Sequence, residues 1–128
     1  MAIQGLDHLA IRVNDLDAAI EGYKKIGFKL DKIIETPTIG KQAIFRMPNG
    51  TFIELVAATD PNSAVGQALE KRGEGVHSVI FTTDDFDQTI GEMKDNGAHV
   101  IVSEELAGNA FVHPKTANGV LVQIQQKK

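Results

Sequence analysis

The sequence predicts an α+β fold in which two βαβββ modules pair to form a curled mixed sheet with a concave cleft. The first observation is an internal repeat: shifted by 70 residues, His8–Leu30 aligns without a gap on Ser78–Val100. The second is that a strand, a helix and three further strands follow in the same order in both copies. The identities fall where a module needs them: Asp15 with Asp85, Asp17 with Asp87, Ile20 with Ile90, Lys24 with Lys94, and Gly27 with Gly97.

The first module begins with an alternating strand, Gly5–Val13, followed by the helix N-cap candidates Asn14 and Asp15. Apolar residues at helical spacing predict the helix, and Gly27 is placed to end it in the left-handed region. Three strands follow: Phe28–Ile34, Gln42–Arg46 and Thr51–Ala57, with Asn49-Gly50 as the turn between the last two.

The second module repeats this pattern from the strand Gly75–Thr83, with Asp84 and Asp85 as N-cap candidates and Gly97 as the helix end. Its later strands are expected at Ala98–Val102, Ala110–His113 and Val120–Ile124, with a turn at Asn118-Gly119. A short helix near Ser63–Lys71 lies in the connection. We therefore expect one domain over 1–128, with modules at about 1–59 and 74–128 joined by the linker 60–73.

Composition limits the partners. The 128 residues carry 13 basic and 17 acidic side chains, a net charge of −4, which does not favour nucleic-acid binding. No apolar run is long enough for a membrane helix. The absence of cysteine excludes thiolate metal ligands and a cysteine nucleophile and suits a cytoplasmic protein. We expect a small-molecule ligand, with no nucleic acid or membrane as partner.

Strand alternation selects the residues that face the cleft. In the first strand Leu9, Ile11 and Val13 should face the helix, which leaves His8, Ala10 and Arg12 on the opposite side. The repeat places Ser78 at the position of His8, and a shift of 69 places Gln123 at that of Glu54. Four related cleft positions result: His8, Glu54, Ser78 and Gln123.

A histidine and a carboxylate in one cleft are two ligands of a metal site for Co, Mn, Ni, Zn or Fe. The candidate ligands are His8, Glu54, His77 and Gln123, and His77 reaches the site only if its strand twists or bulges. The simpler alternative is a hydrogen-bonded pair of His8 and Glu54 with no metal. Glu54 and Gln123 are the candidate catalytic residues, and the candidate substrate-binding residues are Arg12, Gln42, Ser78 and Lys115.

Four segments carry a resemblance to a known family: GLDHLAIRVNDLDAAIEGYKKIGF, TFIELVA, SAVGQALEKRGEGVHSVIFTTDDFD and FVHPKTANGVLVQI. The chain resembles the vicinal oxygen chelate superfamily over nearly its whole length, and within it the methylmalonyl-CoA epimerases most of all. The resemblance implies one divalent ion that stabilises an enolate, an acid/base group on each side of the reacting carbon, and commonly a homodimer.

Carried over by residue, the resemblance places metal ligands at His8, Glu54, Ser78 and Gln123, and the first proton-transfer carboxylate at Ala43, beside Gln42. Ser78 and Gln123 thus replace stronger metal ligands, and an alanine stands where the resemblance implies a carboxylate. We expect an isomerase or lyase that acts on a small carbonyl or acyl-thioester compound by metal-assisted enolate chemistry. One alternative is a metal-free enzyme with His8 or Glu54 as base, and the other a non-catalytic binding protein of the resistance type.

Overall fold

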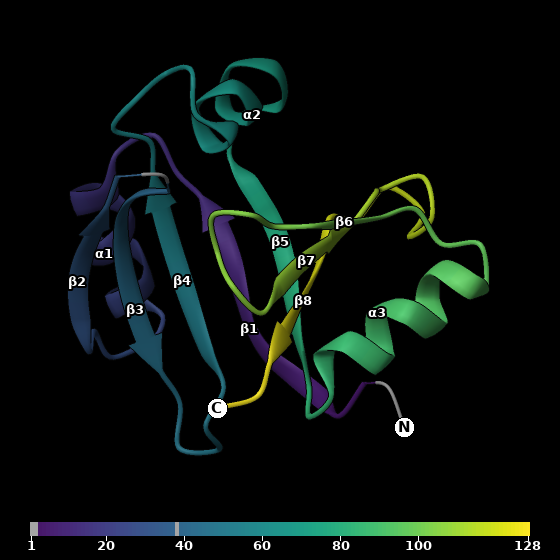
Figure 1. The fold of residues 1–128 in the computed structure, drawn as a ribbon. Helices are drawn as coiled ribbons and strands as arrows, with labels where there is room; N and C mark the ends of the chain where they lie inside the picture. The colour runs from purple at the N-terminus through teal and green to yellow at the C-terminus, as the bar shows by residue number, and fades with distance from the viewer. Residues whose placement is uncertain (1–2, 38) are drawn as a thin grey trace. The chain divides into compact units, whose positions relative to one another are not determined.

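The computed structural model describes residues 3–37 and 39–128 (Figure 1). Its helices and strands follow the repeated βαβββ order, with one extra helix between the two copies. In chain order they are β1 (Gly5–Arg12), α1 (Leu16–Lys25), β2 (Lys32–Thr36), β3 (Gly40–Arg46), β4 (Phe52–Ala57), α2 (Ala64–Arg72), β5 (Gly75–Thr83), α3 (Phe86–Asp95), β6 (Val100–Val102), β7 (Asn109–Val112) and β8 (Val122–Gln126). None of the helices in the described ranges is long and apolar enough to cross a membrane.

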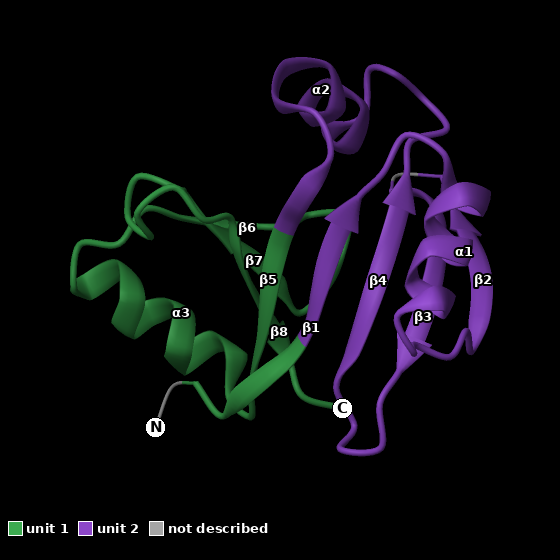
Figure 2. Cartoon of the chain, turned by 180° about the vertical axis from the view of Figure 1, so that it is seen from behind, with its two compact units in different colours: residues 1–7, 78–128 green, residues 8–77 purple. Residues whose placement is uncertain are grey.

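The chain divides into two compact units, coloured separately in Figure 2. Unit 2 is His8–His77, and unit 1 combines Ser78–Lys128 with the described residues up to Asp7. The chain passes from one unit to the other within β1 and again within β5. The helix α2, which the sequence places in a linker, belongs to unit 2.

Unit 2 is a four-stranded sheet in the order β2-β3-β4-β1, in which β1 and β4 are parallel and the other pairs antiparallel. The helix α1 covers one face. Its buried core consists of Val13, Leu16, Ile20, Ala43, Phe45, Ile53 and Leu55, with Ile11 and Tyr23 packed at the edge. In β3 and β4, the residues that alternate with these core residues point to the opposite face of the sheet.

Unit 1 has the same topology, β6-β7-β8-β5, with β5 and β8 parallel and the remaining pairs antiparallel. Its core joins Ile90 of α3 to Ala110 and Val112 of β7 and Ile124 of β8. The predicted α+β class with two βαβββ modules is therefore confirmed, and the repeat in the sequence is a repeat in structure.

The two repeated helices begin and end in the same way. The side chains of Asp15 and Asp85 accept hydrogen bonds from the amides of Ala18 and Gln88, as N-caps do. At the other end, Gly27 and Gly97 adopt φ of 104° and 88°. In both helices the amides at and after this glycine bond back to helix carbonyls, which is the Schellman arrangement. Both glycine positions were predicted from the sequence.

Removing one N-cap side chain should have a measurable effect. We expect Asp15→Ala to lower the free energy of unfolding by about 1 kcal/mol, because the Ala18 amide loses its acceptor. Asp17→Ala is the matched control, since Asp17 lies in the first turn of the same helix. Urea denaturation of both variants is the measurement, and an equal or larger loss for Asp17→Ala would contradict the cap assignment.

Three strands begin at least two residues later than the sequence predicts. The strand expected at Phe28–Ile34 starts at Lys32, because Phe28 and Leu30 pack on the core without pairing and so imitate a strand in the apolar pattern. Similarly, β6 starts at Val100. The last strand starts at Val122, because the chain from His113 to Val120 forms turns in which its amides bond to nearby carbonyls.

Candidate functional site

The face of the unit 2 sheet opposite α1 gathers the polar side chains. In the register of β1, β4 and β3, His8 pairs with Phe52 and Phe52 with Arg46, while Glu54 pairs with Ala10 and Ile44. Since residues that alternate with Ile53 and Leu55 point away from the core, Phe52 and Glu54 lie on this second face. The orientation expected for His8 is confirmed.

A chain of polar contacts crosses this face. The Glu54 carboxylate lies 3.4 Å from His8, measured from Oε2 to Nε2, and both side chains are about nine-tenths buried, with 12% and 10% exposed. Gln42 Nε2 donates to Glu54 Oε1 at 2.7 Å. The hydroxyl of Thr36 in turn donates to Gln42 Oε1 at 3.2 Å. Thr36 thereby orients the Gln42 amide so that its NH₂ group faces the carboxylate.

This arrangement gives Glu54 and Gln42 different chemical capacities. An amide does not take up a proton at ordinary pH, so Gln42 can orient a group or bind one but cannot act as a base. Glu54 has one oxygen occupied by Gln42 and the other directed at an imidazole that can carry a proton. A buried carboxylate beside a histidine is a suitable pair for moving a proton.

Arg12 lies on the same strand as His8 and is 7% exposed. Its Nε donates to the Gly73 carbonyl at 2.7 Å and its Nη1 donates to the Val76 carbonyl at 2.8 Å. The guanidinium therefore ties β1 to Gly73, just after α2, and to Val76, near the start of β5. The substrate-binding role expected for Arg12 stays a prediction, because much of its donor capacity is already used.

His77 is partly buried, and its Nδ1 is a buried atom without a hydrogen-bond partner in the described structure. Burial lowers the pKa of His77, as do the positive charges of Arg12 and Arg72, while Glu54 acts in the opposite direction. The sequence made His77 a candidate metal ligand only if its strand twists or bulges. The pKa of His77 therefore responds to three charged groups of unit 2, Arg12, Arg72 and Glu54.

The lowered pKa of His77 has a consequence for stability. The unfolded chain protonates this imidazole near pH 6.5, whereas the folded chain does so only at lower pH, so stability falls as pH decreases below about 6.5. We expect His77→Gln to reduce this fall. Urea denaturation between pH 5 and 8 with chelator present is the measurement. Parallel curves for the two proteins over the whole range would contradict the expectation.

The remaining sequence candidates lie in unit 1. Ser78 is buried, and Gln123 Nε2 donates to Asn109 Oδ1 at 2.8 Å. Asn109 and Gln123 occupy the same places in their module as Gln42 and Glu54 do in theirs. Gln42 lies two residues before Ile44, the strand partner of Glu54. Asn109 likewise lies two residues before Phe111, the strand partner of Gln123. Lys115 is exposed, and its backbone amide donates a hydrogen bond to His113 Nδ1 at 3.1 Å.

One expected position is wrong. The sequence comparison placed the proton-transfer residue of the third strand at Ala43, but Ala43 is fully buried in the core beneath α1. Because neighbouring strand residues point to opposite faces, the side chain that reaches Glu54 is that of Gln42. Ala43 therefore does not lie on the face that carries Glu54.

The residues present do not fit a tightly held divalent ion. His8 and Glu54 supply two suitable donors in unit 2, but Ser78 and Gln123 are neutral groups in unit 1. In residues 3–37 and 39–128, no three His, Cys, Asp or Glu side chains are grouped so that they could hold a metal. Two strong donors are fewer than the three or more protein ligands usual in a stable site.

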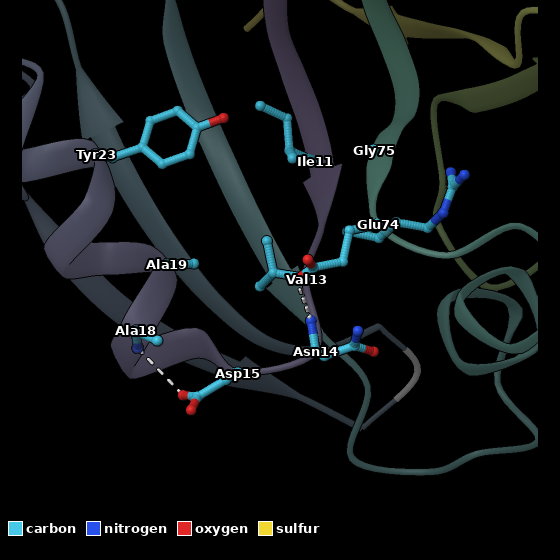
Figure 3. Close-up of a pocket in the computed structure, with 10 residues that line it drawn as sticks. Ile11, Val13, Asn14, Asp15, Ala18, Ala19, Tyr23, Glu74 and Gly75 are labelled. Atoms are coloured by element: carbon cyan, nitrogen blue, oxygen red, sulfur yellow. Dashed lines mark hydrogen bonds between the residues drawn. The ribbon is translucent and has the colours of Figure 1, made fainter.

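A pocket of about 660 Å³ lies on the other side of β1 (Figure 3). Tyr23, Ala18 and Ala19 of α1 face it from one side, and Ile11 of β1 and Val13, just after β1, from the other. The Asn14 amide donates to Glu74 Oε2 at 2.9 Å at its edge. Among the sequence-predicted site residues only Arg12 lines this pocket, so it is separate from the contacts around Glu54.

Sequence reasoning missed Thr36, Phe52 and Asn109. Thr36 lay beyond the end of the predicted strand, so its alignment with Gln42 was hidden. A detectable signal existed for Phe52, because the Asn49-Gly50 turn sets a hairpin register that pairs it with Arg46. Asn109 likewise fell just outside a predicted strand boundary.

The family comparison agrees with the repeated fold. The model described as the Glyoxalase/Bleomycin resistance protein/Dioxygenase superfamily matches residues 5–124. The chain is 33% identical to the ethylmalonyl-CoA/methylmalonyl-CoA epimerase of Cereibacter sphaeroides, over 94% of this chain and 96% of that protein. It is 30% identical to the mitochondrial methylmalonyl-CoA epimerase of Homo sapiens, over 94% of this chain and 73% of that protein.

Solved structures give the same result. The methylmalonyl-CoA epimerase of Mycobacterium tuberculosis matches with a TM-score of 0.86 and 29% identity, covering 99% of this chain and 90% of that one. A Streptomyces coelicolor epimerase variant in complex with 2-nitronate-propionyl-CoA matches at 0.84 with 31% identity, covering 98% of both chains. The paired βαβββ modules thus define a glyoxalase-like protein. The chain belongs to the Glyoxalase/Bleomycin resistance protein/Dioxygenase superfamily.

Proposed function

We propose that this protein is an isomerase of the epimerase type that exchanges the hydrogen α to the carbonyl of a small acyl-CoA thioester. The observation that carries the proposal is the buried Glu54 carboxylate, held by Gln42 at 2.7 Å and facing His8 at 3.4 Å. The epimerase relatives and the acyl-CoA analogue in the Streptomyces coelicolor structure support the substrate class.

In the proposed reaction Glu54 is the base. The α-carbon–hydrogen bond breaks, its proton passes to Glu54 Oε2, and the electron pair moves toward the thioester oxygen to form an enolate. His8 holds the carboxylate oriented and can share the proton, because its Nε2 faces the same oxygen. Return of a proton to the carbon completes the exchange.

Inversion at the carbon requires a proton from the opposite face of the enolate. Gln42 and Gln123 cannot supply it. His77 is the candidate in unit 2, since its buried Nδ1 has no hydrogen-bond partner among the described residues and an imidazole can carry a proton. Because the donor set does not fit a tightly held divalent ion, the proposed steps use only side chains of this chain.

The test is conversion of a single enantiomer of methylmalonyl-CoA or ethylmalonyl-CoA, followed by chiral chromatography of the hydrolysed acid. We expect loss of enantiomeric excess that is catalysed by the wild-type protein in chelator-treated buffer. Conversion that appears only after a divalent ion is added would support metal-assisted chemistry instead, with His8 and Glu54 as its ligands. No conversion under either condition would overturn the proposed function.

A second candidate function is non-catalytic binding of the same kind of ligand. One observation favours it. Two of the polar groups on the sheets are the amides of Gln42 and Gln123, which can form hydrogen bonds to a ligand but cannot take up or release a proton. Calorimetric titration with propionyl-CoA distinguishes the two functions. Saturable binding together with the absence of any exchange or inversion would favour the binding protein.

We also propose that the protein forms a homodimer. Each unit leaves one edge strand with exposed apolar side chains, Ile33 and Ile34 on β2 and Ile101 and Val102 on β6. Such edges favour pairing with another chain. Light scattering during size-exclusion chromatography tests the proposal, and a monomer mass would reject it.

A further inference from the structure

Phe52 lies between His8 and Arg46 across three neighbouring strands of unit 2. Its ring stacks on the His8 imidazole with centroids 4.1 Å apart and planes inclined by 11°. The guanidinium carbon of Arg46 lies 5.1 Å from the centroid of the Phe52 ring. These contacts follow from the register, because Phe52 is the strand partner of His8 on one side and of Arg46 on the other.

The outer end of this stack is itself anchored. Arg46 Nε donates to Asp31 Oδ2 at 3.0 Å, and the Asp31 amide donates to the Ile44 carbonyl of β3 at 2.8 Å. A cation within about 6 Å of an aromatic centroid is attracted to the ring. The side chain of Arg46 is half exposed, so it restrains Phe52 from the solvent side while His8 contacts it from the buried side.

The stack acts on the torsions of His8. An imidazole held flat against a phenyl ring can slide but cannot turn about its second side-chain torsion without losing the contact. The same ring must present Nε2 to Glu54 Oε2, 3.4 Å away. The stack therefore restricts the ring orientation in which this contact forms.

We propose that Phe52 is a positioning residue, which with Arg46 holds the His8 imidazole in the orientation that faces Glu54. The structural part stands on the stacking geometry, and the effect on turnover rests on the proposed function. Phe52 does not exchange protons, so its contribution is orientation alone. Arg46 acts through Phe52 and should have a smaller effect than Phe52 itself.

The first experiment reads the orientation of His8 without any substrate. A ¹H–¹³C spectrum of the imidazole Cε1–Hε1 groups contains one signal for each of the four histidines, and loss of a signal in His8→Gln assigns His8. Ring current from Phe52 should shift the His8 proton upfield. We expect Phe52→Leu to abolish that shift and Phe52→Tyr to retain it.

The matched control is Phe28→Leu, which also removes a partly buried phenyl ring from unit 2 but contacts Tyr23 rather than His8. It should destabilise the unit and leave the His8 signal in place. Circular dichroism establishes that each variant is folded. An unshifted His8 signal in the wild type, or equal changes in Phe52→Leu and Phe28→Leu, would overturn the proposal.

The second experiment measures turnover. A misplaced catalytic group costs on the order of 10- to 100-fold in rate, so Phe52→Leu should lower kcat by that factor with little change in KM, and Phe52→Tyr should restore it. A fall in kcat/KM caused by KM alone would contradict positioning. If the spectra behave as expected but no variant or wild type turns over an acyl-CoA, the proposed function fails and the stacking assignment stands.

Discussion

Glu54→Gln is expected to slow α-hydrogen exchange of the acyl-CoA substrate by about 10²- to 10⁴-fold, the contribution typical of a positioned acid/base group. Glutamine has nearly the same shape and can still accept the hydrogen bond from Gln42 through its oxygen. It cannot take up the substrate proton. Binding of propionyl-CoA, measured by calorimetry, should change little in comparison.

The control for charge is Glu35→Gln. Glu35 is an exposed carboxylate on β2 of the same unit, so this variant removes the same charge away from the polar face. It should retain wild-type exchange, while Glu54→Asp should retain part of it because a carboxylate remains at a greater distance. An active Glu54→Gln, or an equally inactive Glu35→Gln, would remove Glu54 from the role of base.

Phe45→Ala is expected to have the largest effect on stability, a loss of about 3–5 kcal/mol in the free energy of unfolding. Phe45 is fully buried and lies in the core between the unit 2 sheet and α1, with its ring centroid 6.0 Å from that of Tyr23. Truncation leaves a cavity that the surrounding strands cannot close. Since whole domains are stable by only about 5–15 kcal/mol, this is a large fraction of the total.

Urea denaturation followed by circular dichroism measures this loss. Met47→Ala is the matched control, because Met47 is packed only at the edge of the same core and should lose less. A loss below about 1 kcal/mol for Phe45→Ala, against the usual range for a buried phenylalanine, would show that the core under α1 is not as described.

The repeat made the topology predictable. Both copies of the pattern need the same residue types at the two ends of the helix. Residue type and position therefore identified the N-caps, Asp15 and Asp85, and the helix ends, Gly27 and Gly97. Alternation also placed His8 on the face that carries Glu54. Strand starts were less predictable, because apolar residues such as Phe28 can pack on a core without pairing in a sheet.

The contacts within the site were predictable only in part. The pairing of His8 with Glu54 followed from strand phase, whereas the proton-transfer position implied by the resemblance, Ala43, faces the core. The stack on Phe52 depends on the register of three strands, and the environment of His77 depends in part on Arg12, which is distant in sequence. Such contacts between distant segments leave no periodic signal in the chain.

Exchange of the α-hydrogen in deuterated water tests the central claim most directly, because it detects enolate formation whether or not the carbon inverts. Methylmalonyl-CoA is incubated with the wild-type protein and with Glu54→Gln in chelator-treated D₂O, and mass spectrometry follows the gain of one mass unit. We expect catalysed incorporation with the wild type and incorporation at least about 100-fold slower with Glu54→Gln. Background incorporation with the wild type, or equal incorporation with both proteins, would contradict proton transfer by Glu54.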